Sequence, residues 1–184
     1  MKPNQSRQED RWVRLGETPL LLVGSAPVAG DLLGGDFALP AGRNTTSPLT
    51  RASLCRGAVI VSTLPDIGKH ACALQVLDLE EHVRTELPGV RLVHVASDDA
   101  SRWNEVDWYH PDLRAEGYTV AGAPAASRRA FTSAFGVGVS GSDRVAHGLF
   151  ALRDGRFEVV DIPVQQLGSP DVHGFLRALA ARRM

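Results

Sequence analysis

The chain has 184 residues, a length that suits one folded domain whose core buries most of its apolar surface. Its 20 basic and 21 acidic residues give a net charge of -1, whereas nucleic acids and anionic membranes both require a net basic face. No apolar run approaches the roughly 18 residues of a membrane span. Residues 1–14 lack the apolar stretch of a secretory signal. We therefore expect a cytoplasmic protein that binds neither nucleic acid nor membrane.

The first third of the chain predicts short strands joined by turns. Residues 1–10 are polar and are expected to form a flexible leader, followed by a single domain over residues 11–184. Two apolar runs, residues 12–15 and 20–23, surround a Gly-Glu-Thr-Pro turn and predict a β-hairpin. Residues 25–50 are rich in Gly, Pro, Ser and Thr, and we expect one short strand there, near residues 37–39.

The middle of the chain carries the strongest signals. Residues 58–62 read Ala-Val-Ile-Val-Ser, and this β-branched apolar run predicts a buried strand. A helix is predicted over residues 70–87 and ends before a Pro-Gly pair. Its apolar residues fall on one helical face and are Cys72, Val76, Leu79, Val83 and Leu87.

The second half alternates strands and helices. We expect a strand over residues 90–96, a short helix over 99–109, a strand over 118–121 and a helix over 127–135. Two strands, residues 148–152 and 157–162, flank an Asp-Gly pair and predict a hairpin. Ser169 is expected to cap a last helix that runs to about residue 180, with Asp171 in its first turn. This order predicts an α/β, thioredoxin-like fold, with a central mixed β-sheet flanked by helices and an N-terminal β-hairpin extension.

Cys72 is the first candidate for a reactive residue. It lies in the first turn of the helix that follows the strongest strand, where unpaired N–H groups and the helix dipole stabilise a thiolate. A strand-to-helix turn also places it at the carboxyl edge of the sheet, where the sites of α/β proteins usually lie. Cys72 belongs to the apolar stripe of its helix as well, so a buried structural cysteine is the alternative.

The residues around Cys72 resemble a known signature. Residues 64–73 read Leu-Pro-Asp-Ile-Gly-Lys-His-Ala-Cys-Ala. This stretch resembles the peroxiredoxin motif Pro-x-x-x-Thr/Ser-x-x-Cys, and more narrowly its thiol peroxidase version, with Pro65 seven residues before Cys72 and Ile67 also matching. Similar stretches are residues 14–20, which resemble the N-terminal hairpin of the family, residues 29–39, and the Phe-Gly-Val of 135–137. The resemblance covers most of residues 14–180 and implies a thiol-dependent peroxidase with a thioredoxin-like fold.

Two positions depart from the family pattern. Lys69 stands where the family has Thr or Ser; its charge could lower the pKa of Cys72 and polarise a peroxide, or its ammonium group could simply be solvated. His147 stands where the family has an arginine. It would stabilise a thiolate more weakly and in a pH-dependent way, or it could be a structural histidine that fills the vacated space. The predicted catalytic residues are therefore Cys72, Lys69, His147 and Pro65.

The chain lacks the usual resolving cysteine. Members of the family carry it in the segment that corresponds here to residues 100–109, which contains no cysteine. The remaining thiol, Cys55, precedes a strand whose far end leads to Cys72, which separates the two by about 20 Å. A disulfide needs Cα atoms within about 7 Å. We therefore expect a one-cysteine cycle, in which a peroxide converts Cys72 to a sulfenic acid and thioredoxin or a low-molecular-weight thiol reduces it.

The predicted function is that of an enzyme, a thiol peroxidase that reduces hydrogen peroxide or organic hydroperoxides without a cofactor or a metal. Trp103, Trp108 and Tyr109 could form a core edge or part of a dimer surface, and because the family often dimerises near this region we expect a homodimer. The alternative is a catalytically impaired relative that acts as a redox sensor or partner-binding module. A thiol-disulfide oxidoreductase is a more remote option, because the chain has no Cys-x-x-Cys motif.

Overall fold

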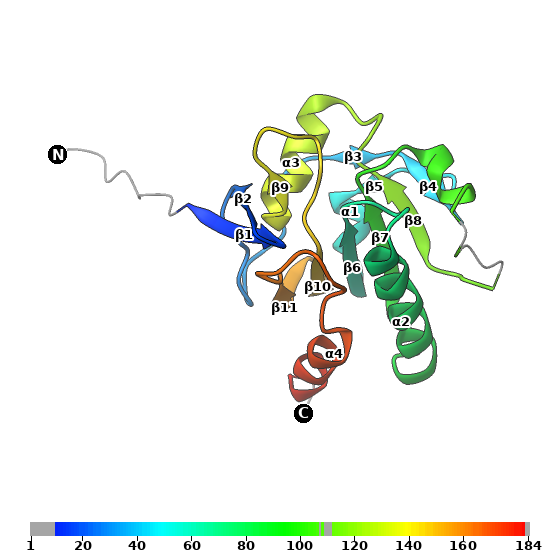
Figure 1. Ribbon diagram of the computed structural model, residues 1–184. Helices are drawn as coiled ribbons and strands as arrows, with labels where there is room; N and C mark the ends of the chain where they lie inside the picture. Colours follow the sequence, from blue (N-terminus) through cyan, green and yellow to red (C-terminus); the bar gives the residue numbers. More distant parts are fainter. Residues whose placement is uncertain (1–9, 107, 109–111, 183–184) are drawn as a thin grey trace.

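A six-stranded mixed sheet lies at the centre of the protein, in a computed structural model that describes residues 10–106, 108 and 112–182 (Figure 1). The strand order is β11-β10-β6-β7-β8-β4. Strands β6, β7 and β8 run parallel, and the other three are antiparallel to their neighbours. The strands are β4 (Ala41–Arg43), β6 (Ala58–Leu64), β7 (Arg91–Ala96), β8 (Glu116–Thr119), β10 (Gly148–Arg153) and β11 (Arg156–Asp161).

The predicted N-terminal hairpin is confirmed. Strands β1 (Arg11–Leu15) and β2 (Thr18–Val23) pair antiparallel, and β9 (Gly138–Val139) extends them to a three-stranded sheet. A separate pair is formed by β3 (Ala38–Leu39) and β5 (Leu49–Thr50). The expected leader lies outside the described residues except for Asp10, so the division of the chain into a leader and one domain stays a prediction.

Helices cover both faces of the central sheet. Helices α2 (His70–Glu86) and α4 (Val172–Ala181) pack on one face, and α1 (Arg51–Leu54) and α3 (Ala125–Phe135) on the other (Figure 1). Strand β6 is buried on both faces, which explains its nearly continuous apolar run. The mixed sheet flanked by helices confirms the predicted thioredoxin-like fold. None of the described helices is long and apolar enough to cross a lipid bilayer.

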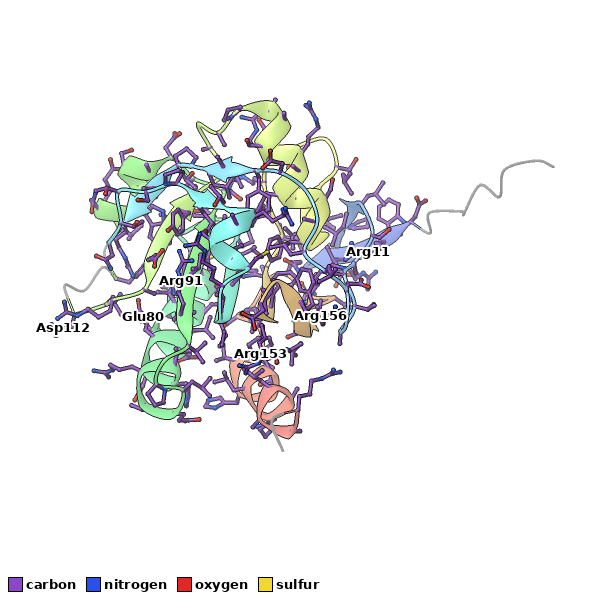
Figure 2. The ribbon with its side chains drawn as sticks, turned by 180° about the vertical axis from the view of Figure 1, so that it is seen from behind. Arg11, Glu80, Arg91, Asp112, Arg153 and Arg156 are labelled. Carbon is purple, nitrogen blue, oxygen red and sulfur yellow. The ribbon has the colours of Figure 1, made fainter. Side chains whose placement is uncertain are left out.

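Side-chain hydrogen bonds connect the sheet and the elements on the face that α1 and α3 cover. Arg91 of β7 donates hydrogen bonds to the Glu116 carboxylate of β8 and, at 3.0 Å, to the Ser53 carbonyl of α1, and Figure 2 shows Arg91 beside this helix. Arg11 of β1 donates at 2.9 Å to the Gly136 carbonyl at the end of α3. The hairpin is thereby anchored to the body of the fold.

Two predicted helices differ from the observed ones. The helix expected over residues 99–109 is a short 3-10 helix, η1 (Ala100–Asn104), because this turn buries Trp103 against the backbone of β4 and β8. The last helix is capped by Asp171, whose carboxylate accepts the Gly174 N–H at 2.8 Å. Ser169 does not cap it, since its hydroxyl donates to the Pro170 carbonyl instead.

Gly42 of β4 allows the close approach of Trp103. A Cβ at this position would overlap Cδ1 and Nε1 of the fully buried indole. Gly42→Ala is therefore expected to lower the free energy of unfolding by about 1–3 kcal/mol, measured by urea denaturation. Gly34→Ala is the matched control, because a Cβ there meets no atom within 4 Å. An equal loss in both variants would contradict the packing argument.

Candidate active site

The loop between β6 and α2 is held by side chains from three other parts of the chain. Arg144 donates from Nη1 to the Pro65 carbonyl at 2.6 Å. Asp98 accepts the Ile67 N–H at 2.9 Å, and Trp108 Nε1 donates to the Ile67 carbonyl at 2.6 Å. These contacts fix the path of the chain into the first turn of α2. Pro65 is half-buried and its carbonyl accepts the hydrogen bond from Arg144, while its predicted catalytic role stays a prediction.

Cys72 lies in this first turn and is only 1% exposed. Burial raises the pKa of its thiol to about 12; the nearby Asp66 and Asp98 carboxylates raise it further, while the Asp66 backbone and the Arg144 charge act in the opposite direction. The loss of solvation therefore outweighs the stabilisation that the helix start offers to a thiolate. At neutral pH the thiol is protonated.

His147 is the polar neighbour of Cys72. It immediately precedes β10 and places Nε2 at 3.9 Å from the Cys72 sulfur, although the two residues are 75 positions apart in the chain. The ring is almost fully buried, and burial lowers the pKa of His147 to about 4. The imidazole is therefore neutral near pH 7. The structure brings the two predicted residues together, but as a neutral pair rather than as a thiolate beside a cation.

Two buried glutamines that the sequence analysis did not single out hold His147. The Gln75 Oε1 lies 2.6 Å from His147 Nδ1, and the Gln166 Oε1 accepts the His147 backbone N–H at 2.6 Å. Gln75 follows Cys72 by three positions and lies on the buried side of α2. A polar residue so close to the apolar stripe of the helix was the sequence signal that could have identified it. Gln166 lies in the segment after β11 and offered no such signal.

Lys69 is exposed at the N-terminal cap of α2. Its side chain forms no hydrogen bond or ion pair with the residues that the structure describes, and its catalytic role stays a prediction. The cation that acts on the Cys72 pKa is Arg144, which sequence reasoning missed because it lies three residues before the position of the family arginine.

The two cations should therefore differ in their effect on Cys72. Arg144→Ala is expected to raise the pKa of Cys72 and to slow its oxidation by about two- to fivefold, because a positive charge near the sulfur is lost. Lys69→Ala is expected to change both quantities less, since Arg144 and not Lys69 is among the charges that shift the Cys72 pKa. Thiol titration and peroxide kinetics measure the two effects. A larger effect of Lys69→Ala would show that the lysine reaches the site.

The second thiol lies at the other end of the sheet. Cys55 follows α1 and packs against Gly155 in the turn between β10 and β11, whereas Cys72 lies near the end of β10 that starts with Gly148. Both cysteines are free. No cluster of three or more potential metal ligands occurs in the described part of the chain.

The aromatic segment near Cys72 contributes to the core. Trp103 is fully buried and packs in one cluster with Cys72 and Val106, and Trp108 packs against this cluster from its half-buried position. Trp103 is therefore part of the core and not of a dimer surface, because its whole side chain is already covered within one chain. Tyr109 lies outside the described residues.

The sequence matches no family model and no curated protein. Solved structures do match. A thiol peroxidase from Chromobacterium violaceum superposes with a TM-score of 0.77 at 17% identity, covering 95% of this chain and 98% of that one. A peroxiredoxin-like protein from Aquifex aeolicus gives 0.74 at 14% identity, covering 94% and 97%. AhpC from Enterococcus faecalis gives 0.67 at 15% identity, covering 84% and 92%. The chain therefore has the fold of thiol peroxidases and peroxiredoxin-like proteins, as its sequence resemblance implies.

Proposed function

We propose that this protein is a thiol-dependent peroxidase that reduces hydrogen peroxide or organic hydroperoxides through Cys72. The observation that carries the proposal is the contact of 3.9 Å between the Cys72 sulfur and Nε2 of His147, at the start of the helix that follows the central strand. A nucleophile beside a base is the arrangement that activates a thiol for attack. The peroxiredoxin-like fold supports peroxide as the class of substrate.

The reaction requires one proton to move and return. The Cys72 thiol gives its proton to His147 while the sulfur attacks one oxygen of the peroxide. The S–O bond forms as the O–O bond breaks, and the departing oxygen takes the proton from His147. It leaves as water from hydrogen peroxide or as an alcohol from an organic hydroperoxide. Cys72 becomes a sulfenic acid and His147 is neutral again.

Reduction of the sulfenic acid uses external thiols. A first thiol attacks the Cys72 sulfur, releases water and forms a mixed disulfide; a second thiol displaces Cys72 and leaves as a disulfide. Thioredoxin or a low-molecular-weight thiol fits this one-cysteine cycle, since Cys55 lies at the opposite end of the sheet. A homodimer and a cytoplasmic location stay predictions from the sequence.

Stopped-flow oxidation of the purified protein by hydrogen peroxide tests the proposal. The wild type is expected to consume peroxide faster than free cysteine and to form one sulfenic acid for each chain. Cys55→Ser is the matched control and should keep this reaction, whereas Cys72→Ser should lose it. A wild-type rate no faster than that of free cysteine would sink the proposal.

A second candidate is a catalytically impaired protein that senses oxidants or binds a partner without turnover. The observation that favours it is the combination of a thiol that is 1% exposed and a pKa raised to about 12, both of which slow attack on a peroxide. Capture of the same partner by the wild type and by Cys72→Ser, together with slow oxidation of the wild type, would support this candidate.

A further inference from the structure

The orientation of the Gln75 side chain is fixed by a carbonyl. Its amide nitrogen lies 3.3 Å from the backbone oxygen of Thr63 and 2.7 Å from the hydroxyl of Ser62, both in β6. A carbonyl oxygen can only accept a hydrogen bond, so the NH₂ end of the amide must face β6. The oxygen end, Oε1, then faces His147. Gln75 is fully buried, so its amide does not face bulk solvent.

This orientation selects one tautomer of His147. Nδ1 of the ring lies 2.6 Å from Oε1 of Gln75, and an amide oxygen has no hydrogen to donate. Nδ1 must therefore carry the proton. A neutral imidazole has one N–H, so Nε2 presents its lone pair, and the atom that it faces at 3.9 Å is the sulfur of Cys72.

The backbone around His147 is held as firmly as the ring. Gln166 accepts the His147 N–H at 2.6 Å and is itself tied to the Pro163 carbonyl at 2.6 Å. Thr63 Oγ1 donates to the Ala146 carbonyl at 2.7 Å. The imidazole therefore has little freedom to turn Nε2 away from Cys72.

We propose that Gln75 is a positioning residue, which holds His147 in the Nδ1–H tautomer so that Nε2 accepts the proton of the Cys72 thiol. The inference deepens the proposed function and rests on it, because the acceptor matters for turnover only if Cys72 reacts with peroxide. An amide orients the ring without adding charge, whereas a carboxylate in its place would favour the imidazolium. The pair accordingly stays neutral at rest and separates charge only when the sulfur attacks.

Few charged groups compete with this arrangement. Those that act on the Cys72 thiol are Asp66 in the loop before α2, Asp98 after β7 and Arg144 before β10. For His147, burial is the cause of the lowered pKa. The ionisation of the pair is therefore open to control by residue 75, which touches the imidazole directly.

Two measurements that need no substrate test the inference. Nitrogen NMR of the histidine rings in the wild type should show His147 protonated at Nδ1 and not at Nε2. In Gln75→Glu, the added carboxylate should draw the proton from Cys72 to His147 and lower the midpoint of thiolate formation by about 1–3 pH units, followed by ultraviolet absorbance. The same substitution in a Cys72→Ser background is the matched control, because it leaves only the signal of Cys55.

The outcomes separate this inference from the proposed function. A wild-type ring protonated at Nε2 overturns the inference even if peroxide is reduced rapidly. A thiolate midpoint in Gln75→Glu within half a pH unit of the wild-type value, in a folded protein, overturns it as well. If Gln75→Glu does not fold, the ring tautomer of the wild type decides alone. If both measurements give the expected results and the protein does not react with peroxide, the proposed function is rejected. The role of Gln75 in orienting His147 toward Cys72 is then still supported.

Discussion

His147→Ala is expected to lower the second-order rate constant for oxidation of Cys72 by hydrogen peroxide by about 10²–10⁴-fold, the contribution typical of a positioned general base. The reason is that the buried thiol has a pKa raised to about 12 and must lose its proton to react. Among the described residues, His147 is the hydrogen-bond partner of the Cys72 sulfur that can accept this proton. Stopped-flow kinetics at pH 7 measure the loss.

The pH dependence separates a lost base from a damaged structure. Without His147, the thiolate forms only by reaction with hydroxide, so the rate of the variant should rise about tenfold for each pH unit. His70→Ala is the matched control, because His70 is exposed two residues before Cys72 and should leave the rate nearly unchanged. A His147→Ala rate close to that of the wild type would remove the histidine from the mechanism.

Mild acid is expected to destabilise the protein by about 3 kcal/mol between pH 6.5 and pH 5. Burial lowers the pKa of His147 to about 4, and burial together with the Arg43 charge lowers that of His94 to about 3. In the unfolded chain both rings take up a proton near pH 6.5. In this range the unfolded chain therefore binds more protons than the folded chain. Stability is then present above pH 6.5 and is lost as the pH falls, and the loss for each histidine steepens from about 0.7 kcal/mol per pH unit at pH 6.5 to about 1.2 kcal/mol per pH unit at pH 5.

Urea denaturation at pH 7, 6 and 5 measures this loss. His94 lies on β7, fully buried beneath α2, and neither of its ring nitrogens has a hydrogen-bond partner among the described residues. His94→Phe should therefore retain only the share of His147, about 1.6 kcal/mol over the same range. An unchanged pH dependence in this variant would show that other groups take up the protons.

The parts of the fold that the sequence predicts well are those with strong local patterns. The run at residues 58–62 and the stripe from Cys72 to Val83 bury so much apolar surface that strand β6 and helix α2 follow directly from them. Strand β4 and helix α1 were missed because three or four residues carry too little periodicity. The capping box of Thr50 and Ser53 was the only local mark of α1.

The sequence singled out two residues that the structure brings together, and it did not predict their charge states. Cys72 was found from its place at the start of a helix and from its motif, His147 was found from its family position, and the structure places the two in contact. The partnership with Gln75 depends on how α2 packs against β6 and β10, across 72 positions of sequence. The same packing brings the Arg144 charge close enough to Cys72 to lower the thiol pKa. Burial also keeps Cys72 and His147 neutral, where a thiolate beside a cation was expected. The burial of a side chain cannot be known until the fold is known.

The pH profile of Cys72 oxidation tests the central claim, that a neutral thiol reacts with peroxide by passing its proton to a neutral histidine. The second-order rate constant of the wild type should exceed that of free cysteine and stay nearly flat from pH 5 to pH 8, because the neutral pair persists between the two pKa values, about 4 and about 12. Free cysteine should rise about tenfold for each pH unit over the same range. A wild-type rate constant that follows this rise, or that nowhere exceeds free cysteine, would contradict the claim.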